Sequence, residues 1–302
     1  MEKKTLMITG ASGFIGSNFI ERYRDKYNII PVDLLKVKPE ELDFTNVDCV
    51  LHLAALVHQM NGAPREKYFE VNTELTKRMA EESKKEGVKH FVFYSTVKVY
   101  GYDGDLYNYN IILNENSSCN PKNDPYGESK WEAEKILKNL EDENFKVGII
   151  RPPMVYGKGV KGNMESLIKF IQRLPILPFN YTKNKRSLVN IENLMYLTSL
   201  VIDKKAQGIF LPLDEKNLSL KEIVEGIEKA YELKRINLPM IQPFFWLLTK
   251  LKPNIMVRLY GSLQFENKET KEKLNYISQI NYENGIKKMI GDEWWKIFYL
   301  FF

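Results

Sequence analysis

The sequence predicts an α/β fold, with a doubly wound parallel sheet and a second, smaller α/β lobe. Two observations predict this class. Short apolar runs alternate with helix-like segments as far as about Pro152, and a length of 302 residues suits two lobes around one cleft. We expect residues 1–152 to form the first domain and residues 188–211 to rejoin it. Residues 153–187 and 212–302 are expected to form the smaller lobe.

The first element is a strand that ends in a glycine-rich turn. The run Thr5–Thr9 is followed by Gly10, Gly13 and Gly16, and then by apolar residues at helical spacing. Glycines let the backbone turn sharply and approach a pyrophosphate, and the helix N-terminus beyond them offers free N–H groups. The spacing is G-x-x-G-x-x-G rather than the commoner G-x-G-x-x-G, so a plain strand–helix turn is the alternative. The pattern favours a Rossmann-type dinucleotide site.

The second strand, Asn28–Val32, leads into Asp33, which lies 17 residues after Gly16. In dinucleotide-binding folds an acid at this place binds the adenosine ribose hydroxyls. A 2′-phosphate about 4 Å from a carboxylate would cost several kcal/mol at an effective dielectric of about 20. NAD(H) is therefore favoured, while NADP(H) is possible because Lys36 and Lys38 follow. A strand-end turn is the alternative role of this acid. The chain then runs too briefly before the next strand to hold a full crossover helix.

Two further buried strands end in small or hydroxyl-bearing residues. The first, residues 48–55, ends in Leu53-Ala54-Ala55, where small side chains leave room for a flat ligand. The second, residues 90–101, carries Ser95 and Thr96. Because ligands bind beyond the carboxyl ends of the strands in such sheets, Thr96 is placed to hold a substrate oxygen, and Ser95 is its competitor for that role.

A helix that begins at Asp124-Pro125 carries Tyr126 and Lys130, one turn apart. We expect it to end near Asn144. A free phenol has a pKa near 10, and lowering that pKa to about 7 takes about 4 kcal/mol. One ammonium about 4 Å away supplies that much at an effective dielectric of about 20. The pair is a candidate proton shuttle for alcohol–ketone chemistry, although such spacing alone more often marks a solvated pair.

Taken together, the motifs resemble the extended short-chain dehydrogenase/reductase superfamily, and within it the NAD-dependent nucleotide-sugar epimerase/dehydratase family. The resemblance covers nearly the whole chain. It rests on five motifs in the family's order: Gly10/Gly13/Gly16, Leu53-Ala54-Ala55, Ser95-Thr96, Tyr126-x-x-x-Lys130 and Arg151-Pro152-Pro153-x-Val155-Tyr156-Gly157.

Carried over position by position, the resemblance implies that Tyr126 is the catalytic acid/base, that Lys130 holds the nicotinamide ribose and tunes the tyrosine, and that Thr96 orients the sugar oxygen. It also implies a set of residues that line the dinucleotide groove, with Asp43-Phe44 at the adenine. These cofactor residues are Gly10, Ser12, Gly13, Phe14, Ile15, Gly16, Asp33, Asp43, Phe44, Leu53, Ala54, Ala55, Asn72, Tyr126, Lys130 and Pro152.

The second half of the chain holds the residues that resemble the family's substrate side. Asn163 and Arg186 match positions that contact the nucleotide diphosphate, and Arg258 is a weaker match for a second arginine. A guanidinium fork suits two phosphates better than an ammonium does, although each arginine can also be an ordinary surface charge. The expected substrate residues are Thr96, Lys98, Tyr126, Asn163, Arg186 and Arg258.

The resemblance implies an NAD(P)-dependent oxidoreductase that acts at C4 of a nucleotide-activated sugar. Thr96-x-Lys98-Val99, the run from Arg151 to Asn163, and Gly261-Ser262-Leu263-Gln264 resemble enzymes that reduce UDP-4-keto-6-deoxy-N-acetylhexosamines, so we expect a 4-ketoreductase. A UDP-hexose 4-epimerase with tightly bound NAD is the alternative, because both reactions use the same residue types. A non-catalytic dinucleotide sensor on the same fold is a minor alternative.

Composition narrows the partners. The charge of +5 suits an anionic sugar nucleotide but falls far short of a nucleic-acid signature. Two cysteines and three histidines show no metal-ligand spacing, so we expect no metal, and His52 is expected in the core, whereas His58 is a weaker substrate candidate. The N-terminus fits no signal peptide, which leads us to expect a cytoplasmic protein.

Other segments are assigned from their composition or from the resemblance. Polar residues 103–121 are expected to form a flexible loop over the active site. Family members usually dimerise through the helices that hold residues 74–86 and 126–144, so a homodimer is expected. Two apolar stretches, residues 243–248 and 294–302, favour packing in the core or between subunits. Contact with a membrane is the less favoured meaning of these stretches.

Overall fold

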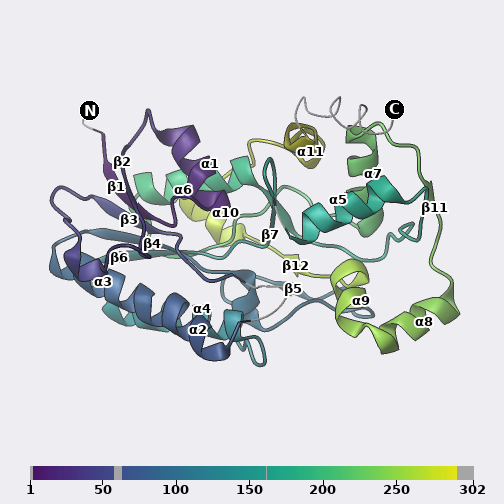
Figure 1. Ribbon diagram of the computed structural model, residues 1–302, viewed down its shortest axis with the longest axis horizontal. Helices are drawn as coiled ribbons and strands as arrows, with labels where there is room; N and C mark the ends of the chain where they lie inside the picture. Colours follow the sequence, from purple (N-terminus) through teal and green to yellow (C-terminus); the bar gives the residue numbers. More distant parts are fainter. Residues whose placement is uncertain (1–2, 58–62, 161, 291–302) are drawn as a thin grey trace.

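A six-stranded sheet forms the larger lobe of the molecule (Figure 1). In the computed structural model, which describes residues 3–57, 63–160 and 162–290, all neighbouring strands of this sheet run parallel, in the order β10-β6-β4-β3-β1-β2. The strands are β1 (Thr5–Thr9), β2 (Asn28–Val32), β3 (Cys49–His52), β4 (His90–Tyr94), β6 (Lys146–Ile150) and β10 (Gly208–Phe210). Since β2 and β3 lie on opposite sides of β1, the sheet is doubly wound, and the predicted fold class is confirmed.

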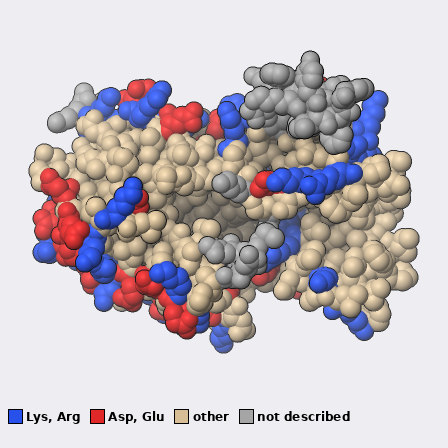
Figure 2. Space-filling model, viewed as in Figure 1, with Lys and Arg blue, Asp and Glu red and all other residues tan. Residues whose placement is uncertain are grey.

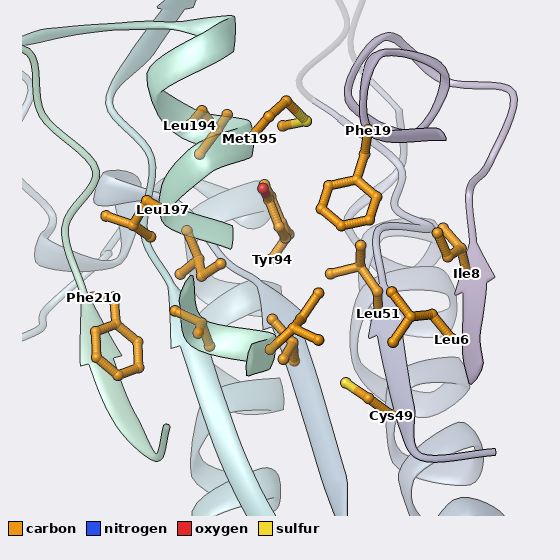
Figure 3. Packing of buried hydrophobic residues seen from close by; sticks show 14 of the residues in the cluster. Leu6, Ile8, Phe19, Cys49, Leu51, Tyr94, Leu194, Met195, Leu197 and Phe210 are labelled. Atoms are coloured by element: carbon orange, nitrogen blue, oxygen red, sulfur yellow. The ribbon is translucent and has the colours of Figure 1, made fainter. Parts of the chain in front are cut away.

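Helices cover both faces of this sheet (Figure 1). Residues of α1 (Phe14–Tyr23) and α6 (Ile191–Asp203) pack on one face, and residues of α3 (Leu75–Lys85) and α4 (Pro125–Leu140) pack on the other. The period-two alternation of β1 sends Leu6 and Ile8 to the first face and Met7 to the second. Figure 3 shows Phe19 of α1 and Leu194 of α6 closing over the strand residues of the first face.

The connections between the strands differ in length as the sequence indicates. Between β2 and β3 the chain forms only a turn and the short 3₁₀ helix η1 (Pro39–Glu41), so the full crossover helix is missing there, as expected. Between β3 and β4 it forms α2 (Arg65–Phe69), the π-helical turn η2 (Glu70–Glu74) and α3. Single π turns occur frequently at functional sites, and this one faces α4.

The smaller lobe has its own hydrophobic core, and Figure 1 shows it beside the carboxyl ends of the central strands. Its elements are α5 (Asn163–Arg173), β8 (Ile176–Leu177), α7 (Leu220–Ala230), β11 (Ile236–Asn237), α8 (Gln242–Leu251), α9 (Pro253–Tyr260) and α11 (Tyr282–Ile290). Strand β11 pairs with β8. Figure 2 shows a hollow near the middle of the molecule, between the two lobes.

Only part of segment 188–211 lies in the central sheet. Strand β10 pairs with β6 there, but β9 (Leu188–Asn190) pairs with β7 (Met154–Tyr156) in a separate two-stranded sheet. Strand β10 occupies the sheet edge beside β6, and β9 pairs with the three residues of β7 instead. Helix α6 packs on the sheet and β10 extends it, so residues 191–210 lie with the larger lobe, while the predicted domain boundaries stay a prediction.

The polar stretch 103–121 is fastened to the C-terminal part of the chain, which corrects the expectation of a loose loop. Strand β5 (Ile112–Leu113) pairs with β12 (Gln264–Phe265), and Asp105 forms an isolated bridge with Ser262. The buried Glu115 accepts hydrogen bonds from Thr270, from its backbone N–H at 2.9 Å and its hydroxyl at 2.6 Å. The segment after β12 continues into α10 (Lys268–Leu274).

Candidate active site

Tyr126, Lys130 and Thr96 meet where α4 passes the carboxyl end of β4. Thr96 follows β4 and caps the 3₁₀ helix η3 (Val97–Tyr100) by accepting a hydrogen bond from the Lys98 N–H. Its hydroxyl lies within hydrogen-bonding reach of the Tyr126 phenol. The fully buried Lys130 ammonium donates to the Tyr94 carbonyl oxygen at 2.8 Å and lies 4.5 Å from the centroid of the Phe93 ring.

Helix α4 begins at Pro125, as predicted, but it ends at Leu140 rather than near Asn144. Asp124 makes no capping hydrogen bond; its carboxylate lies 3.6 Å from the Lys98 ammonium instead. The helix start therefore depends on the fixed backbone of Pro125 rather than on a side-chain cap.

The electrostatics of the pair correct one expectation. Burial raises the pKa of Tyr126 to about 12, although the Thr96 hydroxyl acts to lower that pKa. Burial lowers the pKa of Lys130 to about 7, opposed by the Glu134 carboxylate. Because Lys130 is directed at the Tyr94 carbonyl, it does not supply the predicted lowering of the tyrosine pKa. The polypeptide alone keeps the phenol protonated at neutral pH, which is the form that donates a proton.

A buried ion pair holds α4, the helix that carries Tyr126 and Lys130, against the ends of β4 and β6. The Glu134 carboxylate accepts hydrogen bonds from the Arg151 guanidinium at 3.0 and 2.5 Å and from the Ser95 hydroxyl at 2.5 Å. Arg151 and Glu134 are 1% and 0% exposed, so this pair is shielded from water. Ser95, the competitor of Thr96, is thus engaged by Glu134, which leaves Thr96 beside the phenol.

Asn72 positions the loop that follows β3. It lies in η2, is fully buried, and exchanges hydrogen bonds with the backbone of Leu56 at 2.8 and 3.0 Å. It also donates to the Ser129 hydroxyl on α4 at 3.0 Å. Its side chain therefore positions the loop after β3 instead of lining an open groove.

The buried Thr9 hydroxyl holds the loop that follows β3 in place. Thr9 accepts hydrogen bonds from the N–H groups of Leu53 and Ala54, each at 3.2 Å, and contacts His52 Nδ1 at 2.9 Å. His52 Nε2 lies 3.0 Å from the Thr76 hydroxyl. Burial lowers the pKa of His52 to about 3, so the imidazole stays neutral and belongs to the core, as expected. Leu53, Ala54 and Ala55 are all only partly buried.

The glycine turn fits a dinucleotide pyrophosphate. Gly10 has a φ of +67°, and a Cβ on Gly16 would stand 2.5 Å from the Gly10 oxygen, so both positions need glycine. A Cβ on Gly13 would meet only that same oxygen, at 3.2 Å, which leaves this side of the turn open. Helix α1 starts after Gly13 without a side-chain cap and without an acid in its first turn. Its free N–H groups and positive dipole end are available to an anion.

The predicted adenosine side lies at the end of β2. Asp33 is exposed; its carboxylate accepts from the Leu35 N–H at 3.1 Å and lies 3.6 Å from the Lys36 ammonium. Asp43 is exposed as well, but Phe44 packs in the core at 5% exposure, so only Asp43 offers its side chain. Pro152 is buried after β6 and accepts from the Val97 N–H at 3.3 Å.

The candidate substrate residues come from both lobes. Arg186 donates to the carbonyl oxygens of Val257 and Gly261 at 3.3 and 2.9 Å. Burial lowers the pKa of Arg186 to about 10, and the nearby Arg258 charge acts in the same direction, while Asp103 opposes it. The charges of the two arginines therefore act on one another, which places them in the same region of the molecule.

The other candidate substrate residues are either paired with acids or lie outside the described part of the structure. Lys98 is paired with Asp103 and with Asp124. Asn163 begins α5, but its side chain lies outside the described part of the structure, as does the whole of His58. Among the described residues, no group of three or more His, Cys, Asp or Glu side chains could hold a metal ion.

Comparison with known proteins gives this arrangement its context. Residues 6–210 match the NAD dependent epimerase/dehydratase family. The chain belongs to this family. It is 35% identical to a UDP-glucose 4-epimerase of Vibrio cholerae, over 94% of both chains. It is 28% identical to an N-acetyl-alpha-D-glucosaminyl-diphospho-ditrans,octacis-undecaprenol 4-epimerase of Escherichia coli O157:H7, over 76% of this chain and 73% of that one.

The fold agrees with solved structures. A UDP-glucuronic acid 4-epimerase from Bacillus cereus, in complex with NAD, superposes with a TM-score of 0.74 at 18% identity and covers 97% of this chain and 99% of its own. Membership in the NAD dependent epimerase/dehydratase family confirms the predicted family and the predicted class of enzyme, and it confirms NAD(H) as the expected cofactor type.

Several supporting residues escaped the sequence-based prediction. Glu134 lies one turn after Lys130 on the same face of α4, and that spacing alone could have drawn attention to it. Ser129 and Thr9 act through hydrogen bonds to segments far away in the chain, and no local pattern marks them. Tyr68 of α2 packs with its ring centroid 6.3 Å from that of Tyr126, again across distant parts of the sequence.

The glycine turn yields a paired prediction. Gly13→Ala adds a methyl group on the open side of the turn at an ordinary φ of −72°. We expect this variant to fold normally and to bind NAD at least about tenfold more weakly, as measured by titration calorimetry. Gly16→Ala forces a backbone clash and is expected to lower the melting temperature instead. Unchanged NAD affinity in Gly13→Ala would contradict the assignment of the turn.

His52 yields a prediction on pH. Its pKa is about 3 when folded, against about 6.5 when unfolded, so the unfolded state binds more protons between these values. The stability that His52 contributes is complete above about pH 6.5 and is lost as the pH falls toward 3. Within that window the slope is at most about 1.4 kcal/mol per pH unit.

Urea unfolding at pH 7, 5.5 and 4.5 measures this effect. We expect the free energy of unfolding to fall less steeply with acid in His52→Gln than in the natural protein. His90, whose pKa burial lowers to about 4, is present in both proteins and cancels in the comparison. Equal slopes would show that His52 already titrates normally in the folded state.

Proposed function

We propose that this protein is a 4-epimerase of UDP-activated hexoses that works with a bound NAD. The observation that carries the proposal is the contact between the Thr96 hydroxyl and the Tyr126 phenol beside the buried Lys130. A hydroxyl and a proton donor at one point suit an oxygen that changes between alcohol and ketone. The likeness to UDP-glucose 4-epimerase over nearly the whole chain favours epimerisation over the 4-ketoreductase reaction expected from the sequence.

Each residue has a separate role in this proposal. Thr96 holds the C4 oxygen of the sugar, and Tyr126 gives its proton to that oxygen on reduction. Taking the proton on oxidation requires the phenolate, which the positive charge of a bound NAD would favour over the protonated form that the polypeptide alone maintains. Lys130 fixes the position of α4 against β4 and places a titrating ammonium one turn from the phenol. Arg186 and Arg258 bind the diphosphate and anchor the nucleotide. Bound NAD supplies a hydride acceptor and donor for the sugar carbon.

Residues of the larger lobe hold the dinucleotide in this proposal. The turn at Gly13 and the N-terminus of α1 bind the pyrophosphate, Asp33 binds the adenosine ribose, and the loop at Ala54 borders the groove. Inversion at C4 requires the 4-keto sugar to turn its other face toward the bound cofactor. An anchored diphosphate permits this, because the sugar can rotate about its link to the phosphate while the nucleotide stays bound. A homodimer through α3 and α4 stays a prediction.

The central test uses the purified protein without added NAD(P)H. We expect it to interconvert UDP-glucose with UDP-galactose, or the corresponding N-acetyl sugars, as separated by anion-exchange chromatography. Failure on both pairs, together with oxidation of added NADH or NADPH by a UDP-4-keto sugar, would select the 4-ketoreductase. Dinucleotide binding without turnover of any sugar nucleotide would select the non-catalytic sensor.

The acid/base role has its own test. Tyr126→Phe removes the phenol oxygen and keeps the ring, so turnover is expected to fall at least about 100-fold. The matched control is Tyr196→Phe on α6, whose ring packs with its centroid 6.2 Å from that of Tyr276. This variant should retain activity. Turnover of Tyr126→Phe within a few fold of the natural protein would refute the role, provided that its NAD affinity is unchanged.

A further inference from the structure

Helix α8 leaves most of its apolar surface outside the core of the smaller lobe. None of its residues is buried, and only the row with Phe245 and Leu248 packs against that core. A second row, formed by Phe244, Leu247 and Leu251, is 54%, 45% and 64% exposed. Of the expected packing of residues 243–248 in the core or between subunits, the core part is met by Phe245 and Leu248, and packing between subunits stays a prediction. The other apolar stretch, residues 294–302, lies outside the described residues.

Neighbouring segments extend this surface. Ile241 precedes α8 and is 75% exposed, Ile255 on α9 is 52% exposed, and Trp246 on α8 is 58% exposed. The Lys250 ammonium lies 3.7 Å from the centroid of the Trp246 ring, so an aromatic ring and a cation share one side of the helix. We call these exposed residues of 241–255 the α8 surface. This many exposed large apolar side chains on one helix and its flanks mark a site of interaction.

The charges in the sequence that contains the α8 surface are of one sign. No acidic residue occurs between Glu232 and Glu266, a stretch that holds five cations: Lys234, Arg235, Lys250, Lys252 and Arg258. Figure 2 shows the end of the molecule that carries α8 and α9 as uncharged and basic atoms. Exposed aromatic and aliphatic side chains ringed by Lys and Arg are the composition that binds the interface of an anionic bilayer.

Two other occupants fit less well. In a symmetric contact between two copies, the same patch faces itself, so the cations of one copy would meet those of the other. A membrane-spanning role is also unsupported, because no helix among the described residues is both long and apolar enough to cross a bilayer. With 10 residues, α8 is about 15 Å long and suits an orientation parallel to the membrane plane.

We infer that the α8 surface docks the smaller lobe on an anionic phospholipid bilayer. This revises the expectation that membrane contact is unlikely. Helix α9, which carries Arg258, directly follows α8, and the Val257 carbonyl on it accepts a hydrogen bond from Arg186. Docking therefore brings α9 and the Arg186 that binds its backbone toward the membrane. The inference does not depend on which reaction the cleft performs.

Sedimentation with sucrose-loaded vesicles tests the docking. The full-length protein is expected to sediment with vesicles that contain 30% phosphatidylglycerol and to stay in solution with pure phosphatidylcholine. Phe244→Glu/Leu247→Glu should weaken binding at least about tenfold. The matched control is Ile277→Glu, which charges an equally exposed isoleucine outside the α8 surface, at 73% exposure, and should bind normally. Unchanged far-UV circular dichroism and melting temperature of all variants show that they fold.

The charge requirement is tested separately. Lys250→Gln/Lys252→Gln should weaken binding to anionic vesicles about 30-fold, which corresponds to about 1 kcal/mol for each cation removed. No sedimentation of the natural protein with either vesicle, or equal losses in Ile277→Glu, would overturn the inference. So would a dimer of the natural protein in analytical ultracentrifugation that Phe244→Glu/Leu247→Glu dissociates in the absence of lipid, because the surface would then serve a second copy.

Discussion

The buried ion pair between Glu134 and Arg151 is the constraint on which the candidate site depends. Arg151 directly follows β6, Ser95 directly follows β4, and Glu134 on α4 binds both. The pair thus fixes one helix against the carboxyl ends of two strands. Removing one partner of such a buried pair typically costs about 3–5 kcal/mol, because the other charge is left without compensation. Lys130 and Tyr126, one and two turns earlier on α4, inherit their position from this anchor.

Local patterns made much of the fold predictable. The glycine turn, the start of α4 at Pro125 and the missing crossover helix after β2 each depend on residues adjacent in the chain. The alternation of strands and helices identified the fold class for the same reason. Of the candidate site, the contact of Thr96 with Tyr126 could be predicted because both follow from the ends of regular elements in a known type of sheet.

What the sequence did not reveal depends on distant partners. The pairing of β9 with β7, and of β5 with β12, is decided by which sheet edges are free after folding. The raised pKa of Tyr126 follows from burial, and no pattern among its neighbours in the sequence predicts that burial. The proximity of Arg186 to Arg258 likewise arises only when α9 folds back on the segment before β9.

The number of chain passages between the lobes has a mechanical consequence. The backbone crosses from one hydrophobic core to the other near residues 152, 190, 212, 266 and 280, and it also visits the smaller core at Leu106. The β5–β12 pair adds a noncovalent tie. A hinge of one or two strands can swing open by a few changes in φ and ψ. Here several parallel passages would have to bend together, so the lobes resist wide rotation. Entry to the cleft is then governed by side chains and short loops at its rim rather than by rigid-body motion.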